Sequence, residues 1–497
     1  MKNIKQIFIL LFVFIAMLGC SKIEKVKPNN KVYSNYKKDK LKEVSYRKGN
    51  EIPYLVNVQD ITSIGPIKNL NEKKILEIYK NDKIEGYGDL SPYWRWNVEY
   101  PTSVLEKVLN ANLVAIKKQS KKSVYTLVGG KWSLKPLGRN PLGSLKEIRV
   151  EKRGPSTIAM DLVIVGSKNT FVVVKEYNIR KVLGFSKSRT GINRNIALKG
   201  KGKILKKNVN MLPSAFFAIE KKRNSYMIYG GGFGHGVGMP QYSAYDLSKK
   251  KNANYKEILN HYYQDVKYSK MSSVPNFKGD ILVGITNNSS LEHKRITLKS
   301  PKNIIIKSGR VSKKISSNTE IEITRWNGNI IIKSKGKKIL TTKAEIRVLS
   351  KGKIGVTSIR RKIANKNYPT YYGEFNIRFS PRGNLLLVNK VDVEDYLKGV
   401  VVSEMMSSFG LEALKAQAIT ARTYVAHAII GRKYAKYGIN VDDTVASQVY
   451  NKQNETEIAT EAIRKTKKII LTYEGKPIST YFYSTSSGFS ATPKEVW

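Results

Sequence analysis

Glu404 is a candidate for acid–base chemistry. It lies in the segment Gly399–Phe409, where Met405, Met406 and Phe409 are apolar neighbours. A carboxyl group in apolar surroundings is poorly solvated, so its neutral form is favoured and its pKa rises. A raised pKa is what a general acid needs near neutral pH. Glutamates at helix ends are also common, so spacing alone leaves a structural role open.

A second candidate region is the glycine-rich segment Tyr229–Tyr242, which contains His235, one of only four histidines. Glycines surround it at positions 230, 231, 232, 234, 236 and 238. Such density indicates a loop that takes positive φ angles or lets a ligand approach closely. The pattern Gly-x-x-x-x-Gly-Lys-Ser/Thr is absent, and the spacing is not that of a dinucleotide loop. The alternative is a tight structural turn around a packed histidine.

Metal and nucleophile chemistry find little support. His261, His293 and His427 lack His-x-x-x-His spacing to another ligand, which favours surface or core histidines. The single cysteine excludes an intrachain disulfide and a multi-cysteine zinc site. A Gly-x-Ser-x-Gly elbow is absent. We expect neither a metal nor a cofactor.

Two predicted helices flank Glu404. Asp392 can cap a short helix, with Asp395 three residues later near its positive end. The strongest helical pattern follows in Leu411–Ile430, whose apolar stripe is Leu414, Ala418, Ala421, Val425 and Ala428. A second face, with polar members that could reach a cleft, carries Ala413, Gln417, Thr420 and Tyr424.

Strands are indicated in the rest of the chain. Runs rich in β-branched residues at Glu147–Val150, Thr157–Val165 and Asn169–Tyr177 suggest a meander. Residues 280–350 are dense in short Ile/Val/Thr runs with Asn and Gly turns, and residues 468–473 and 477–484 indicate two more strands. The polar stretch Lys267–Lys278 is typical of a linker. The predicted fold class is α+β.

The N-terminus has the pattern of an export signal. Lys2 and Lys5 precede the apolar run Ile7–Leu18, which is short for a membrane span and suits a signal-peptide core. The following Gly19-Cys20-Ser21 resembles a bacterial lipoprotein signal, which implies cleavage before Cys20 and lipidation of its thiol. An ordinary signal peptide or a short anchor is the alternative. We expect an exported, lipid-anchored protein that faces the cell wall.

Composition limits the partners without selecting one. The chain of 497 residues has 41% apolar and 10% aromatic residues, which argues against extensive disorder. Its 89 Lys+Arg and 38 Asp+Glu give a formal charge of +51, so nucleic acid, anionic lipid and an anionic wall polymer are all compatible partners. The basic residues are spread along the chain. The export signal argues against nucleic acid.

Several blocks together resemble the SpoIID/LytB family of peptidoglycan-acting proteins. The resemblance rests on the glutamate block Asp395–Met405, the helical block Leu411–Tyr424, Asp443-Thr with Gln448-Val-Tyr450, Thr480–Gly488 with Glu495-Val-Trp497, and Gly234–Tyr242. In that family the glutamate block precedes the Gly-His-Gly-Val-Gly-Met block. Here the order is inverted, so the chain looks like a circular permutant, cut after Trp497 and joined across 267–280. A misassembled reading frame would give the same order.

The resemblance implies a SpoIID-like core assembled from two permuted halves. The predicted organisation is a signal peptide (1–19), a tether rich in lysine and asparagine (20–53), the half that carries the glycine segment (54–270), a linker (271–279), a β-rich subdomain (280–385) and the half that carries the glutamate (386–497). Two departures from the family pattern stand out. The motif Ser484–Ser490 lacks the Cys and His that can help bind zinc in some members, and Met406 replaces the usual proline.

The activity implied by the resemblance is lytic transglycosylation of peptidoglycan glycan strands. Glu404 would act first as general acid and then as base, so no second carboxylate is needed. Substrate contacts would come from Gln417, Arg422 and Tyr424 on the long helix, His235, Gln241 and Tyr242 on the glycine segment, and Ser484 and Ser487 at the strand end. The alternative is a non-catalytic wall-binding protein that activates an amidase, in which case an amidase or another wall hydrolase is a partner.

Overall fold

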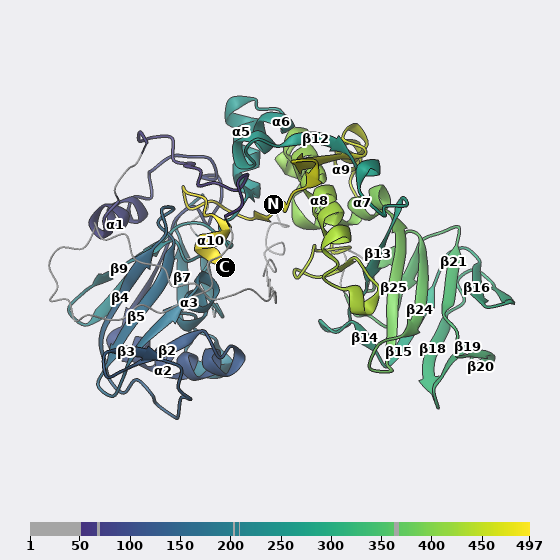
Figure 1. Ribbon diagram of the computed structural model, residues 1–497, viewed down its shortest axis with the longest axis horizontal. Helices are drawn as coiled ribbons and strands as arrows, with labels where there is room; N and C mark the ends of the chain where they lie inside the picture. Colours follow the sequence, from purple (N-terminus) through teal and green to yellow (C-terminus); the bar gives the residue numbers. More distant parts are fainter. Residues whose placement is uncertain (1–50, 67–69, 202–203, 208, 362–366) are drawn as a thin grey trace. The chain divides into compact units, whose positions relative to one another are not determined.

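The computed structural model describes residues 51–66, 70–201, 204–207, 209–361 and 367–497. They form two compact units, each containing helices and strands, so the predicted α+β class is confirmed. Unit 1 is Asp265–Thr480, and unit 2 is the described chain up to Gln264 together with Tyr481–Trp497 (Figure 1). Cys20, the predicted signal and most of the predicted tether lie outside the described residues.

Unit 2 contains two antiparallel five-stranded sheets. The first has the order β8 (Leu205–Lys207), β7 (Asn195–Leu198), β1 (Trp96–Pro101), β10 (Ser225–Gly230) and β9 (Phe217–Lys221). The second has the order β3 (Lys131–Ser133), β2 (Val124–Val128), β6 (Thr170–Val174), β5 (Ala159–Gly166) and β4 (Leu145–Arg153). Because β4, β5 and β6 are successive neighbours, the predicted meander is confirmed. Its last strand was predicted to extend too far, since Tyr177 lies in a helix.

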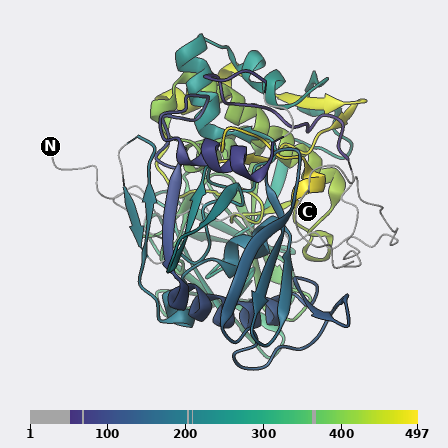
Figure 2. The same ribbon diagram turned by 90° about the vertical axis from the view of Figure 1, so that its left-hand side faces the viewer.

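Helices cover these sheets. α1 (Glu72–Lys80) packs on β9 and β10 (Figure 2), and α2 (Thr102–Gln119) packs on α3 (Glu176–Val182) and α4 (Lys187–Thr190). α5 (Gln241–Lys251) and α6 (Tyr255–Tyr262) follow the glycine segment. The last residues of the chain complete unit 2, where β29 (Phe482–Tyr483) pairs in parallel with β11 (Met239–Pro240), and α10 (Pro493–Val496) ends the chain.

Unit 1 is built partly from two large sheets whose strands alternate along the chain between one sheet and the other. The first sheet has the order β17 (Val311–Ile315), β16 (Ile304–Ser308), β21 (Ile346–Ser350), β24 (Glu374–Phe379), β25 (Leu385–Asp392), β13 (Asp280–Gly284) and β26 (Val441–Asp442), with β14 (Glu292–His293) beside β25. The second has the order β20 (Lys337–Thr342), β19 (Asn329–Ser334), β18 (Ile321–Trp326), β15 (Arg295–Lys299), β22 (Ile354–Val356) and β23 (Thr370–Tyr371).

The two sheets share an isoleucine-rich core. Alternate residues of β16, β18 and β19 are fully buried, namely Ile304, Ile306, Ile321, Ile323, Ile330 and Ile332. A period of two buries one face of each sheet. Hydroxyl pairs link the sheets at both ends of this core, Ser300 with Ser350 at 2.9 Å and Ser308 with Thr342 at 3.0 Å. We call residues 280–385 of unit 1 the β-sandwich.

The helices of unit 1 follow the sandwich. α7 (Val393–Glu404), η2 (Ser407–Phe409) and α8 (Leu411–Gly431) come in succession, and α8 packs on α7, α9 (Glu457–Lys465) and β27 (Ile469–Tyr473) (Figure 1). The Asp392 carboxylate accepts hydrogen bonds from the backbone N–H groups of Glu394 and Asp395, so the predicted cap is confirmed. α8 confirms the predicted long helix.

Two predictions about polar or extended stretches are wrong in part. Lys267–Lys278 is not a linker throughout, because β12 (Lys267–Lys270) pairs with β27 and η1 (Met271–Ser273) follows it. The predicted strand 477–484 is interrupted, since β28 (Lys476–Pro477) ends well before β29 begins. The remaining short helix of unit 1 is η3 (Ala435–Tyr437). Within the described ranges, none of the helices combines the length and apolar character needed to cross a bilayer.

Candidate functional site

The Glu404 side chain lies at the carboxyl end of α7 and is only 7% exposed. Its Oε1 accepts a hydrogen bond of 2.6 Å from the backbone N–H of Val449. Its other oxygen has no hydrogen-bond partner among the residues that the structure describes. One carboxyl oxygen is therefore fixed, and the other can hold and release a proton.

The surroundings of Glu404 tune its acidity. Burial raises the pKa of Glu404 to about 7, and the Val449 hydrogen bond and the Lys452 ammonium partly oppose this rise. The raised pKa follows from the loss of water around the charged form. Near neutral pH both protonation states are populated, which suits a group that must donate a proton and later accept one.

A segment across residues 443–452 holds the hydrogen bond to Glu404 in place. The buried Asp443 carboxylate anchors its start: Oδ1 accepts from the N–H and hydroxyl of Thr286 at 3.0 and 2.7 Å, and Oδ2 accepts from Arg361 at 2.7 Å. Arg361 also donates to the backbone carbonyl of Tyr450 at 3.1 Å. Thr286 and Arg361 belong to the β-sandwich, so the sandwich supports the loop that orients the acid.

Close packing fixes the same segment against α7. A Cβ atom at Gly399 would lie 2.2 Å from Asn451 Oδ1 and 2.7 Å from a ring carbon of Tyr450. One turn further along α7, the Ser403 hydroxyl accepts a hydrogen bond of 3.0 Å from the backbone N–H of Lys452. Gly399 therefore permits an approach that any larger residue would prevent.

Lys452 is a site residue that the sequence reasoning missed. Burial lowers the pKa of Lys452, the Arg361 charge lowers it further, and Glu404 opposes the change. Its ammonium is thus close enough to influence the acid. Lys452 could have been identified from the sequence, because it lies two residues after the Gln448-Val-Tyr450 block. Arg361 could not have been identified in this way, because it is distant in sequence from that block.

The predicted contacts on α8 have different surroundings. Gln417 is fully buried, and neither its amide oxygen nor its amide nitrogen has a hydrogen-bond partner among the described residues. Arg422 is also fully buried; it donates to both carboxylate oxygens of Glu394 at 3.0 and 2.7 Å and to the carbonyl of Ile469. Arg422 therefore ties α8 to α7 and β27. Direct substrate contact by either residue stays a prediction.

Tyr424 is half-buried on the same helix. Burial raises the pKa of Tyr396 well above its usual range, and the nearby Tyr450, Tyr424 and Glu404 add to the rise. Tyr424 and Glu404 thus both lie near one buried phenol. Tyr396 therefore links the predicted acid with a predicted α8 contact.

In unit 2, the His235 side chain contacts both the glycine segment and the last residues of the chain. Its Nδ1 accepts from the Val237 N–H at 3.0 Å, which assigns the proton to Nε2, and Nε2 lies 3.2 Å from the Phe482 carbonyl. Burial lowers the pKa of His235 to about 3, and Arg180 adds to this effect. The Trp497 ring lies 5.5 Å from the imidazole. His235 is therefore neutral, with both ring nitrogens occupied.

The other predicted residues of unit 2 gather around the same chain end. Gln241 is buried and its amide nitrogen has no partner in the described part of the chain, while the Tyr242 N–H donates to the Ser484 carbonyl at 3.0 Å. The Ser487 hydroxyl is buried and lies 3.2 Å from the Phe489 carbonyl. Glu404, Gln417, Arg422 and Tyr424 thus belong to unit 1 and the other five to unit 2. The groove that would join them stays a prediction.

The segment that contains the acid is similar to known proteins. Residues 381–473, which include Glu404, match the family model described as SpoIID, Stage II sporulation protein. Stage II sporulation protein D of Bacillus subtilis is 37% identical over 124 residues, which are 22% of this chain and 36% of that protein. The amidase enhancer of Bacillus subtilis is 39% identical over 101 residues, which are 20% of this chain and 13% of that protein.

An uncharacterized protein of Brachyspira hyodysenteriae is 37% identical over 129 residues, 26% of this chain and 34% of that protein. The chain is an α+β protein. Residues 381–473 are similar to the SpoIID/LytB family. The matched segment spans about a third of the length of the first curated relatives.

Proposed function

We propose that the chain is a lytic transglycosylase that cleaves the bond between N-acetylmuramic acid and N-acetylglucosamine in peptidoglycan. The observation that carries the proposal is the environment of Glu404: buried, held through one oxygen by Val449, and half-ionised near neutral pH. The family similarity supports a wall substrate.

The chemistry needs only this one carboxyl group. Protonated Glu404 donates its proton to the glycosidic oxygen as the bond from that oxygen to C1 of the muramic residue breaks. The resulting carboxylate accepts the proton of the muramic C6 hydroxyl, whose oxygen forms the new bond to C1. The products are a 1,6-anhydro end and a free 4-hydroxyl on the released sugar. No water is consumed, and the carboxyl group regains its proton.

The test is digestion of peptide-free glycan strands, with detection of 1,6-anhydro ends by mass spectrometry. We expect wild type to produce them, and Glu404→Gln to produce none while keeping its fold, since a glutamine oxygen can still accept from Val449. Glu412→Gln is the matched control, because that carboxylate opens α8 and pairs with Lys415 at 2.5 Å. If Glu404→Gln still produced anhydro ends, the assignment of Glu404 would be wrong.

The second candidate function is activation of a wall amidase without glycan cleavage. It is favoured by the similarity to the amidase enhancer. Here wild type would bind sacculi and raise the rate of a purified amidase, yet release no anhydro ends from glycan strands. That combination of results would replace the first proposal with the second.

We also propose that the protein is exported and lipid-anchored through Cys20, and that its blocks are circularly permuted. Lipid-precursor labelling that is lost in Cys20→Ala tests the anchor.

The permutation is supported by unit 2, where Lys494 pairs with Glu51 and the Asn57 amide donates to Glu495 at 2.7 Å. Rejoining distant chain segments requires such proximity. A chain re-ordered to the family arrangement should keep the activity of the original.

A further inference from the structure

Positive charge is concentrated in one part of the β-sandwich. Residues 294–343 contain 14 Lys and Arg but only two carboxylates, against 89 and 38 in the whole chain. Every one of these cations except Lys299 is exposed. The two carboxylates are already engaged, since Glu322 pairs with Arg295 at 2.5 Å and Glu320 accepts from the Thr357 hydroxyl at 2.6 Å.

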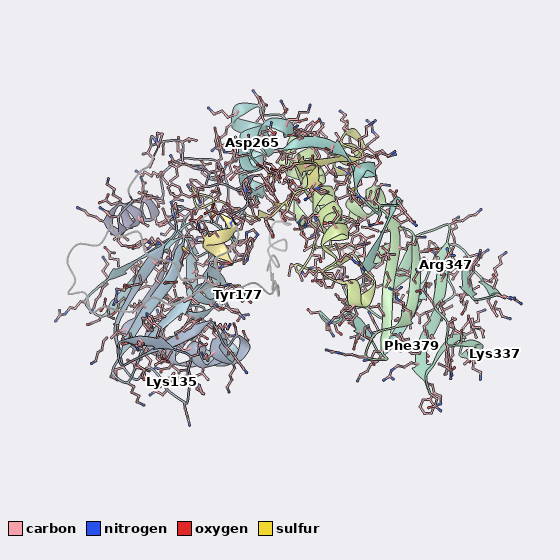
Figure 3. All side chains as sticks on the ribbon, in the orientation of Figure 1. Lys135, Tyr177, Asp265, Lys337, Arg347 and Phe379 are labelled. Carbon is pink, nitrogen blue, oxygen red and sulfur yellow. The ribbon has the colours of Figure 1, made fainter. Side chains whose placement is uncertain are left out.

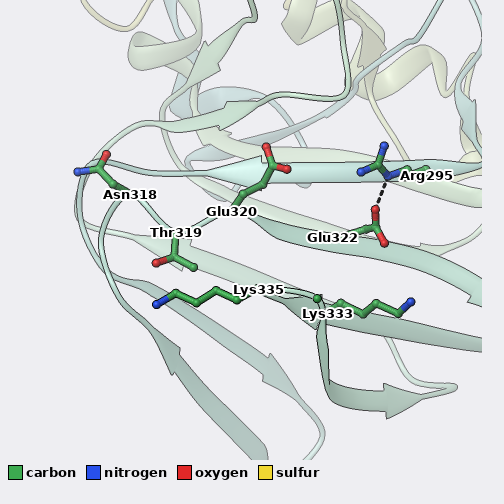
Figure 4. A pocket seen from close by; sticks show the side chains of 8 residues that line it. Arg295, Asn318, Thr319, Glu320, Glu322, Lys333 and Lys335 are labelled. Carbon is green, nitrogen blue, oxygen red and sulfur yellow. Dashed lines mark hydrogen bonds and ion pairs between the residues drawn. The ribbon is translucent and has the colours of Figure 1, made fainter.

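A hollow of about 480 Å³ lies in this region, but it is not where the charge is unopposed. It is lined by Arg295, Asn318, Thr319, Glu320, Glu322, Lys333, Lys335 and Gly336 (Figure 4). Its lining includes both carboxylates of the region, Glu320 and Glu322. Exposed cations also lie at one end of the sandwich, together with exposed apolar side chains.

Three chain segments meet at that end. The β16–β17 turn follows Ser308, the β18–β19 turn follows Trp326, and β20 ends at Thr342. The Ser308 and Thr342 hydroxyls are 3.0 Å apart, which joins the two sheets there. Asn327 and Gly328 have φ of 47° and 69°, as a two-residue hairpin turn requires, so the hairpin tip is short and rigid.

Apolar side chains protrude from this end and cations surround them. Trp326 is 69% exposed and Val311 is 41% exposed. Lys294, Arg310, Arg325 and Lys343 are exposed, and none of the four has a carboxylate partner in the described part of the chain. We call these six residues the cationic tip.

We infer that the cationic tip docks on an anionic lipid bilayer. Indole rings prefer the boundary between headgroups and hydrocarbon, and each Lys or Arg near an anionic leaflet adds attraction. An end made of short turns with an exposed indole fits a planar surface. A linear polyanion would instead be matched by cations aligned along a groove. The inference is independent of the proposed glycan chemistry.

The test uses the full chain and vesicles of phosphatidylglycerol and phosphatidylcholine, with brominated lipid as the fluorescence quencher. The fluorescence of Trp326 is the difference between the spectra of wild type and of Trp326→Phe. That variant removes one of the five tryptophans. We expect quenching and a blue shift of the Trp326 fluorescence on anionic vesicles. Both effects should disappear on pure phosphatidylcholine vesicles and at high salt, because surface attraction is screened.

A matched pair of variants separates docking from net charge. The first double variant, Arg325→Gln with Lys343→Gln, removes two cations from the cationic tip. The second, Lys335→Gln with Lys337→Gln, removes two cations from the opposite end of the same hairpins. Lys337 projects from the sandwich there (Figure 3). We expect the docking constant to fall about fivefold per tip cation and to change much less in the second variant. Equal losses in both would overturn the inference. The inference would also be overturned if anionic vesicles left the fluorescence of Trp326 unquenched. It would likewise be overturned if wall polymer, and not vesicles, protected Trp326 from quenching.

Discussion

Replacing Glu404 by glutamine should make unit 1 more stable at alkaline pH. In the folded chain burial raises the pKa of Glu404 from 4.5 to about 7. A raised carboxyl pKa means that the folded state binds the proton more tightly than the unfolded state. Stability is therefore highest while the group is protonated, and it declines as pH rises from about 4.5 to about 7. Glutamine resembles the protonated side chain at every pH.

The magnitude follows from the two pKa values. Each factor of ten in proton affinity corresponds to about 1.4 kcal/mol, so a rise from 4.5 to about 7 makes the ionised carboxylate cost about 3 kcal/mol above pH 7. Glu404→Gln removes this cost and keeps an oxygen that can accept from Val449. For a unit of this size, about 3 kcal/mol corresponds to roughly 6–12 °C in Tm.

The assay is thermal unfolding of wild type and Glu404→Gln at pH 4 and pH 8. We expect the difference in Tm between the variant and wild type to grow by that amount at the higher pH. Other titrating groups are shared by both proteins, so they cancel in the comparison. Glu412→Gln, which alters an α8 carboxylate paired with Lys415, is the control. A Glu404→Gln difference that is the same at both pH values would refute a buried carboxyl group with a raised pKa.

Two further variants probe the same surroundings. Lys452→Met removes a cation that favours ionised Glu404, so the pKa of Glu404 should rise further. The alkaline limb of the pH–rate profile should then move to higher pH. An unchanged limb would show that Lys452 does not influence the acid. Gly399→Ala forces a Cβ atom into Asn451, so we expect glycan cleavage to fall about 100-fold. Gly431→Ala, with open space at its Cβ position, should leave cleavage unchanged.

Local patterns in the sequence identified the elements that carry the acid. Asp392 as a cap, the stripe of α8 and the apolar neighbours of Glu404 are all visible within a few residues. Such signals depend on short-range spacing, so they can be recognised without knowledge of the fold. The predicted meander of β4 to β6 rests on the same kind of evidence.

Other features depended on contacts between distant residues. The strand β12 was hidden in a polar stretch because its partner, β27, lies about 200 residues later. The burial of Gln417 and the ion pair of Arg422 with Glu394 come from helix packing that the helical pattern does not specify. Patterns show which residues share a face of a helix, but packing decides which of them remain accessible.

The residues that support Glu404 show that the segment matched by the family model is not the whole site. Residues 381–473 contain the acid, Val449 and Asp443, yet Asp443 is held by Thr286 and Arg361, which lie outside the matched segment. Without them a buried carboxylate would lose its hydrogen-bond partners, which is costly. The acid therefore depends on the β-sandwich as well as on its own helices.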